Sequence, residues 1–164
     1  WLADDHEVEI PFDKAKAEFE RRLQTMPESD KLHFNAGAAS YKLGDFAKAV
    51  DHFTKALLSD NQRLREDASY NLANSLVRRG ETAKGNEEKK ADWKNAIQHF
   101  TEALNLDPKN KQAEENRDIV KKMLEHQIIR IPVVRDGKLL GMISRTDLLN
   151  HLIDDHLINV YGGS

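Results

Sequence analysis

Residues 44–61, "GDFAKAVDHFTKALLSDN", are closely matched by residues 91–108, "ADWKNAIQHFTEALNLDP". In both segments an aromatic residue is followed by an alanine three positions later and by a phenylalanine four positions after that. Residues spaced by three and four lie on one face of an α-helix, so each segment is predicted to be an amphipathic helix. The duplication predicts a protein built from repeated helices.

An earlier copy sets the period of the repeat. Phe12 and Phe19 precede Phe46 and Phe53 by 34 residues. The copy that starts at Trp93 lies 47 residues after Phe46, which indicates an insertion of 13 residues. Two of these lengthen a turn near "NQRLRED", and eleven form "ETAKGNEEKKA" at 81–91. Because the latter is charged and rich in lysine, we expect an inserted, solvated loop there rather than a docking element.

The segments before these helices also match. "FNAGAASYKLGD" aligns with "YNLANSLVRRGE" without a gap, which places Asn35 over Asn71. A later segment, "AEENRDIVKKMLE", brings Asn116 to the same position. Paired helices with this period resemble the tetratricopeptide repeat (TPR) family over residues 12–126. The resemblance implies a mainly α-helical solenoid of about three repeats, in which aromatic residues fill the core between stacked helix pairs.

Within that family, three segments together with the lysine-rich interruption resemble the TPR proteins found beside von Willebrand factor A-type proteins in bacterial aerotolerance operons. These segments are "LHFNAGAASYKLGDFAKAV", "ASYNLANSL" and "WKNAIQHFTEALNLDPKNKQAEENRDIV". The resemblance implies a von Willebrand factor A-type protein as one possible partner.

The TPR resemblance also implies a concave groove that holds a peptide or a partner helix. The first helix of each repeat lines this groove, which here means residues 30–43, 65–79 and 110–125. The residues expected to face it are Asn35, Tyr41, Lys42, Asn71, Asn74, Arg78, Asn116 and Lys122. Asparagine can donate to and accept from a peptide backbone, and the cations favour acidic groups or a terminal carboxylate. Alternatively, the asparagines form hydrogen bonds only within the stack.

The pattern changes after His126. "IIRIPVV" and "LLGMIS" have the β-branched or alternating composition of strands, and "RDGK" between them carries a hairpin turn signal. "RTDLLNHLIDDHL" then returns to helical spacing. The sequence thus predicts a small α/β appendage, a β-hairpin plus a helix, over residues 127–158. Residues 1–11 form an N-terminal extension and 159–164 a tail.

The string "IIRIPVVRDGKLLGMISRTDLLNHL" resembles a cystathionine β-synthase (CBS) motif, a module that senses adenosyl ligands. The resemblance implies that Ser144 and Asp147 contact ribose and phosphate, with Ile131 and Pro132 beside the adenine. A capping box, with Ser144 as N-cap, explains the same pair without a ligand. CBS motifs work in pairs, whereas this one is single, and an isolated two-stranded sheet is marginally stable. We therefore expect homodimerisation through this segment.

Other chemistry is not indicated. The net charge is −3 with mixed signs, unlike the basic footprint of a nucleic-acid binder, and the chain has no cysteine. His151 and His156 beside Asp154 and Asp155 suggest either a weak metal site or a solvated helix end. We expect no enzymatic activity, no metal and no cofactor, apart from the adenine nucleotide above.

Three hypotheses follow: a TPR adaptor that binds a protein or peptide, a nucleotide sensor that acts through a dimeric tail, or a TPR protein with a functionless appendage. No apolar run reaches the roughly 18 residues of a membrane helix. We expect a cytoplasmic protein, or alternatively an exported or membrane-tethered one whose signal has been removed, since the chain starts at Trp1.

Overall fold

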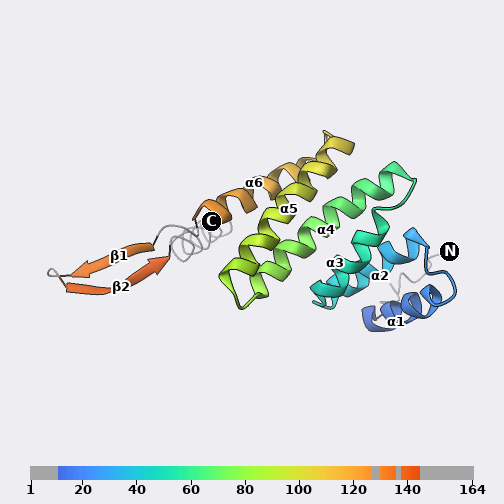
Figure 1. Ribbon diagram of the computed structural model, residues 1–164, viewed down its shortest axis with the longest axis horizontal. Helices are drawn as coiled ribbons and strands as arrows, with labels where there is room; N and C mark the ends of the chain where they lie inside the picture. The colour runs from blue at the N-terminus through green and yellow to red at the C-terminus, as the bar shows by residue number, and fades with distance from the viewer. Residues whose placement is uncertain (1–10, 127–129, 136–137, 145–164) are drawn as a thin grey trace, which may run out of the picture. The chain divides into compact units, whose positions relative to one another are not determined.

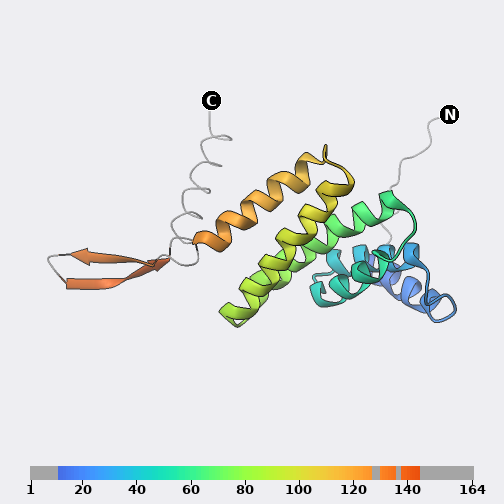
Figure 2. The same ribbon diagram turned by 45° about the horizontal axis from the view of Figure 1, so that its top comes forward.

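The computed structural model describes residues 11–126, 130–135 and 138–144, and these form helices followed by a two-stranded sheet (Figure 1). The helices are α1 (Phe12–Leu23), α2 (Asp30–Lys42), α3 (Phe46–Ala56), α4 (Gln62–Thr82), α5 (Asn86–Leu106) and α6 (Lys111–His126). Contacts divide the chain into two units, one up to Arg117 and one from Asp118. Within the first unit each helix from α1 to α4 packs against the next one (Figure 2).

Side-chain caps fix where the helices begin. Ser29, Asp45 and Asn61 precede α2, α3 and α4, and each accepts a hydrogen bond from the backbone N–H three residues later. These oxygens satisfy amides that have no partner inside a helix. Gly44 has a φ of 77°, the left-handed conformation that glycine adopts at low cost after a helix end. The turns of the repeat are therefore encoded locally.

The core consists of aromatic rings set among small residues, as the sequence predicts. Phe53, Trp93 and Phe100 are buried, whereas Phe46 is only partly so. A Cβ atom on Gly37 would lie 3.0 Å from the ring of Phe53, so glycine allows α2 and α3 to approach closely. The buried alanines are Ala36, Ala39, Ala49, Ala56, Ala68, Ala73, Ala96, Ala103 and Ala113.

The six described helices do not divide into three complete helix pairs, because the first helix is already the second member of its repeat. By its period α1 is the second helix of a repeat, α2–α3 and α4–α5 are complete pairs, and α6 is a first helix. Among the residues that the structure describes, the "about three repeats" of the prediction are therefore two complete pairs flanked by two single helices. This phase explains why no residue of α1 is buried and why Phe12 is 50% exposed.

The prediction of a loop over the whole of residues 81–91 is wrong, because only residues 83–85 lie between the two helices. Helix α4 continues to Thr82 and α5 begins at Asn86, so the insertion lengthens both helices to 21 residues each. The composition that suggested solvation is also that of an exposed helix, since Glu and Lys are strong helix formers. Glu87 and Glu88 lie in the first turn of α5, where acidic residues stabilise the helix dipole.

In the second unit, β1 (Arg130–Arg135) and β2 (Lys138–Ser144) pair antiparallel. Arg130 lies opposite Ser144 and Ile131 opposite Ile143, and the register shifts between Val133 and Val134. These strands lie where the sequence predicts a hairpin. The helix predicted after them, the tail at 159–164 and most of the N-terminal extension lie outside the described residues.

No helix in the described part of the chain is both long enough and apolar enough to cross a membrane.

Candidate protein-binding surface

A cation and two aromatic rings from three helices meet at one end of the paired helices. Tyr41 at the end of α2 contacts Phe46 of α3 edge to face, with ring centroids 5.5 Å apart. Arg78 of α4 lies over the same ring, its Cζ 5.4 Å from the centroid. The guanidinium is exposed, and it also pairs with Glu81 at 3.2 Å. An exposed cation held against aromatic rings can bind a carboxylate and pack apolar groups beside it.

The exposed polar residues of α2 extend this surface. Asn35 and Lys42 are both exposed, and they lie seven residues apart, so they share a face of the helix. Tyr41, beside Lys42, is partly buried by Phe46. We call the surface formed by Asn35, Tyr41, Lys42, Phe46 and Arg78 the α2–α4 face.

The remaining predicted asparagines are engaged within the fold. Asn71 donates to the carbonyl of Asp67 in its own helix at 2.7 Å. Asn116 of α6 donates to Asn74 Oδ1 at 3.1 Å and to the hydroxyl of Tyr70 at 3.3 Å. The bonds of Asn116 join α6 to α4, whereas the bond of Asn71 stays within α4. Asn71, Asn74 and Asn116 remain partly accessible, whereas Lys122 is exposed on α6, in the second unit.

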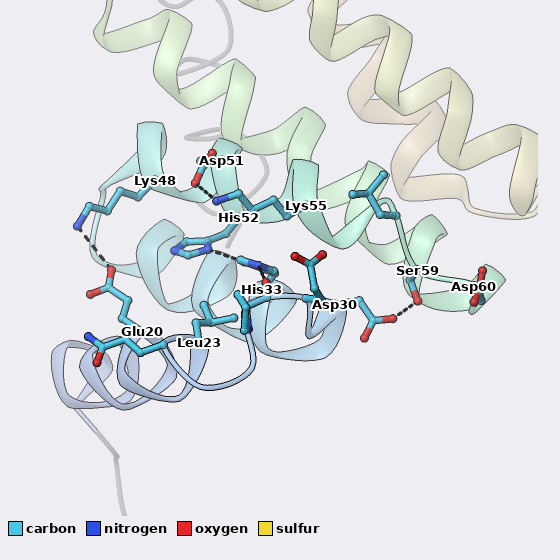
Figure 3. Close-up of a pocket in the computed structure, with 14 residues that line it drawn as sticks. Glu20, Leu23, Asp30, His33, Lys48, Asp51, His52, Lys55, Ser59 and Asp60 are labelled. Atoms are coloured by element: carbon cyan, nitrogen blue, oxygen red, sulfur yellow. Dashed lines mark hydrogen bonds and ion pairs between the residues drawn. The ribbon is translucent and has the colours of Figure 1, made fainter.

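A pocket of ≈ 840 Å³ opens elsewhere, between α1 and α3 (Figure 3). Two buried histidines lie in it, His33 from α2 and His52 from α3, with their Nδ1 atoms 3.1 Å apart. None of the predicted groove residues lines this pocket. Sequence reasoning missed the pair because the two residues are 19 positions apart. The signal was available, since antiparallel helices of one repeat bring such positions together.

Charges of both signs surround the histidines and are largely paired. Lys48 lies 3.5 Å from Glu20, Lys55 lies 3.0 Å from Asp51, and Ser59 donates its hydroxyl to Asp30. The last bond is the main cause that lowers the pKa of Asp30. Burial lowers the pKa of His52, and its neighbour His33 lowers it further. His52 is therefore held in its neutral form near neutral pH.

The residues proposed for a nucleotide or a metal are only partly described. Ile131 and Pro132 lie in β1, and Ser144 ends β2 opposite Arg130. Asp147 and the His151–His156 region lie outside the described residues. Among the residues that the structure does describe, no group of three metal-ligating side chains comes together.

Comparisons with known families agree with both resemblances. Residues 30–62, which span α2 and α3, match the family model of the tetratricopeptide repeat. Residues 116–154 match that of the CBS domain, and this match begins within α6. No curated protein matches the chain. The chain thus carries one segment that matches the tetratricopeptide repeat and a later one that matches the CBS domain.

Proposed function

We propose that this protein is a non-enzymatic adaptor that binds a peptide or protein partner on the α2–α4 face. The tetratricopeptide match supports an interaction role. The observation that carries the choice of surface is exposed Arg78 over the ring of Phe46, which also contacts Tyr41, with a second exposed cation, Lys42, next to Tyr41 in the sequence. Such a surface favours an acidic segment or a free C-terminal carboxylate with an apolar neighbour.

Peptide selection on the full-length chain tests this proposal. A displayed library of random peptides, half of them ending in a free carboxylate, is selected on the immobilised protein. We expect enrichment of acidic or carboxylate-ended sequences. Binding of a selected peptide to the Lys42→Glu/Arg78→Glu variant should weaken by at least about tenfold, because two attractive charges become repulsive.

A matched control reverses the same number of charges elsewhere. Arg22→Glu/Lys94→Glu changes exposed cations on α1 and α5, the second helices of their repeats. This variant has the same net charge as the test variant but keeps the α2–α4 face. If both variants lost affinity equally, the loss would be due to the change in net charge, and this result would contradict the proposed surface.

A second candidate function is favoured by the CBS-domain match at 116–154. In it the C-terminal segment binds an adenine nucleotide through Ile131, Pro132, Ser144 and Asp147 and thereby alters partner binding. Titration of AMP, ATP and S-adenosylmethionine by calorimetry tests this candidate, with Asp147→Ala as the control. Saturable heat that the substitution abolishes would support it, and silence from all three ligands would exclude these ligands.

We also propose that the chain dimerises through this segment. In the described part of the sheet each strand has a single neighbour, so β1 and β2 each keep an unpaired edge. Open edges bind further strands, and a two-stranded sheet gains stability from a second one. Sedimentation velocity over a hundredfold range of concentration should show a dimer. A monomer throughout would contradict this part of the proposal.

The proposals for the partner and for the cellular compartment are based only on resemblance to known families. We propose a von Willebrand factor A-type protein as the first candidate to test, on the three segments that resemble the aerotolerance proteins. A cytoplasmic location fits a CBS-domain segment, because its nucleotide ligands are cytosolic. Co-purification from cells that carry a tagged chain, followed by fractionation, tests both points.

A further inference from the structure

The two buried histidines share one hydrogen bond in nearly linear geometry. Their Nδ1 atoms are 3.1 Å apart and their ring centroids 5.4 Å apart, so each nitrogen points directly at the other ring. A metal ion held by both nitrogens would instead draw the rings into an angle. One proton between the nitrogens explains the arrangement.

The bond to Pro27 fixes which ring donates when the pair is neutral. His33 Nε2 lies 2.8 Å from the carbonyl oxygen of Pro27, which can only accept, so Nε2 carries the proton. In the neutral ring His33 Nδ1 is then an acceptor, and His52 Nδ1 donates to it. His52 Nε2 is left as the acceptor for a first additional proton. This proton leaves the shared bond intact.

A second additional proton cannot be accepted without opening the pair. It must go to His33 Nδ1, the atom that accepts the shared bond. Two N–H groups and two positive charges would then face each other at 3.1 Å, at side chains that are only 7% and 8% exposed. Repulsion in such a buried site is severe. One ring must therefore turn away.

Neighbouring charges shift the pH at which the second additional proton binds, but they do not change how many protons the closed pair can hold. The charged groups that line the pocket with the pair are Glu20 of α1, Glu28 of the following turn, Asp30 of α2, Lys48, Asp51 and Lys55 of α3 and Asp60 beyond α3, and Figure 3 labels all of them except Glu28. The carboxylates favour protonation of the pair and the lysines oppose it. The limit of one extra proton is set by the acceptor atom itself.

The pair adds side-chain hydrogen bonds to the packing of α2 against α1 and α3. His33 binds the turn after α1 through Pro27 and binds α3 through His52. Helix α1 has no buried residue of its own. Its described polar links to α3 and to the α3 cap are ion pairs, Lys16 to Asp45 at 2.9 Å and Glu20 to Lys48 at 3.5 Å.

We propose that His33 and His52 form a proton-operated latch, in which uptake of the second proton releases α1 and its following turn from α2 and α3. The partly buried side of α1, including Phe19 and Leu23, then becomes available, and the pocket opens. The latch is specific to one repeat. By the repeat alignment, His52 corresponds to His99 in α5, but His33 corresponds to Ser69, so no such pair forms between α4 and α5.

Hydrogen exchange on the full-length chain tests the latch. Amide protection, corrected for intrinsic rates, is compared at about pH 7.5 and about pH 5, on either side of the ordinary histidine pKa. We expect residues 12–23 to lose at least about tenfold of their protection at the lower pH, while α4 and α5 keep theirs. In His52→Asn this pH dependence should disappear, because the amide donates to neutral His33 and accepts from charged His33.

His99→Asn is the matched control, since His99 occupies the same repeat position and pairs with Glu102 at 2.7 Å. It should retain the full pH response of α1. If His52→Asn does not fold, an NMR titration of the imidazoles in the wild type tests the proposal instead. The second proton should then bind at the same pH at which α1 loses its amide protection. Double protonation with α1 still protected, unchanged protection until the whole chain unfolds, or loss of the response in His99→Asn would overturn the proposal.

Discussion

Arg79 of α4 and Asp92 of α5 form a bidentate ion pair, with Nε to Oδ2 at 2.9 Å and Nη2 to Oδ1 at 2.7 Å. The carboxylate side chain is only 11% exposed. This pair joins the two helices at the base of the insertion, close to the point where Trp93 Nε1 donates to the carbonyl of Val77. The ion pair explains why the inserted charged residues extend α4 and α5 as packed helices instead of forming a separate loop.

Asp92→Ala should lower the free energy of unfolding by about 2 kcal/mol, because it leaves the guanidinium of Arg79 without its planar, charge-assisted partner. Urea denaturation followed by circular dichroism measures the change. The control is Asp51→Ala, which removes an exposed partner of Lys55 and should cost less than about 0.5 kcal/mol. Equal effects of the two substitutions would show that the Arg79–Asp92 pair is no stronger than a surface pair.

Gly80→Ala should destabilise the protein by about 1–2 kcal/mol, even after the gain in helix propensity, because the core around it is filled. The new Cβ would lie 2.8 Å from Trp93 Cδ1, and the ring is held in place by its bond to Val77. Thermal unfolding checks this. Gly85→Ala, whose Cβ would meet only Glu88 at 3.7 Å, should cost less. A stabilising Gly80→Ala would contradict the described packing.

The stability of the wild type should fall as the pH drops below about 6.5. The pKa of His52 is lowered in the folded state, first by burial and then by His33. The unfolded chain therefore binds this proton at a higher pH than the native chain does. The contribution is complete above the unfolded pKa and is lost as the pH falls through the folded pKa, at up to about 1.4 kcal/mol per pH unit for each such proton.

Urea unfolding at several pH values measures that slope. His52→Asn should flatten it between about pH 6.5 and pH 5, whereas His99→Asn should leave it steep. A slope that is the same in wild type and His52→Asn would mean that other groups carry the pH dependence.

Asn116→Ala should lower the free energy of unfolding by about 1 kcal/mol, since its amide bridges Asn74 and Tyr70. Asn35→Ala, at an exposed position of α2, should leave stability within about 0.5 kcal/mol of wild type. Denaturation midpoints compare the two. Similar losses would show that Asn35 also has a structural role.

The period and composition of the sequence predict the helices well, because buried alanines and aromatics such as Phe53 and Phe100 recur at fixed spacing. The 81–91 segment could not be predicted in this way. A charged stretch with a glycine fits a loop as well as a helical extension, and the Arg79–Asp92 pair that favours the helix is a tertiary contact. The long-range pair of His33 and His52 is likewise a property of the packed repeat.

The site residues likewise include some whose positions follow from the sequence period and others whose contacts depend on the folded structure. Lys42 and Arg78 are exposed, and their positions on the helices follow from the period alone; that they face a binding groove stays a prediction. Whether an asparagine binds a neighbour depends on which side chain the next helix presents. The contact of Asn116 with Tyr70 and Asn74 therefore required the folded structure.

The most direct test of the adaptor proposal is an NMR titration of the isotope-labelled full-length chain with a selected acidic peptide. We expect the largest chemical-shift changes at Lys42, Phe46 and Arg78 and their neighbours on α2 and α4. Changes confined to the pocket between α1 and α3, or to the strands of the second unit, would contradict the proposed α2–α4 face.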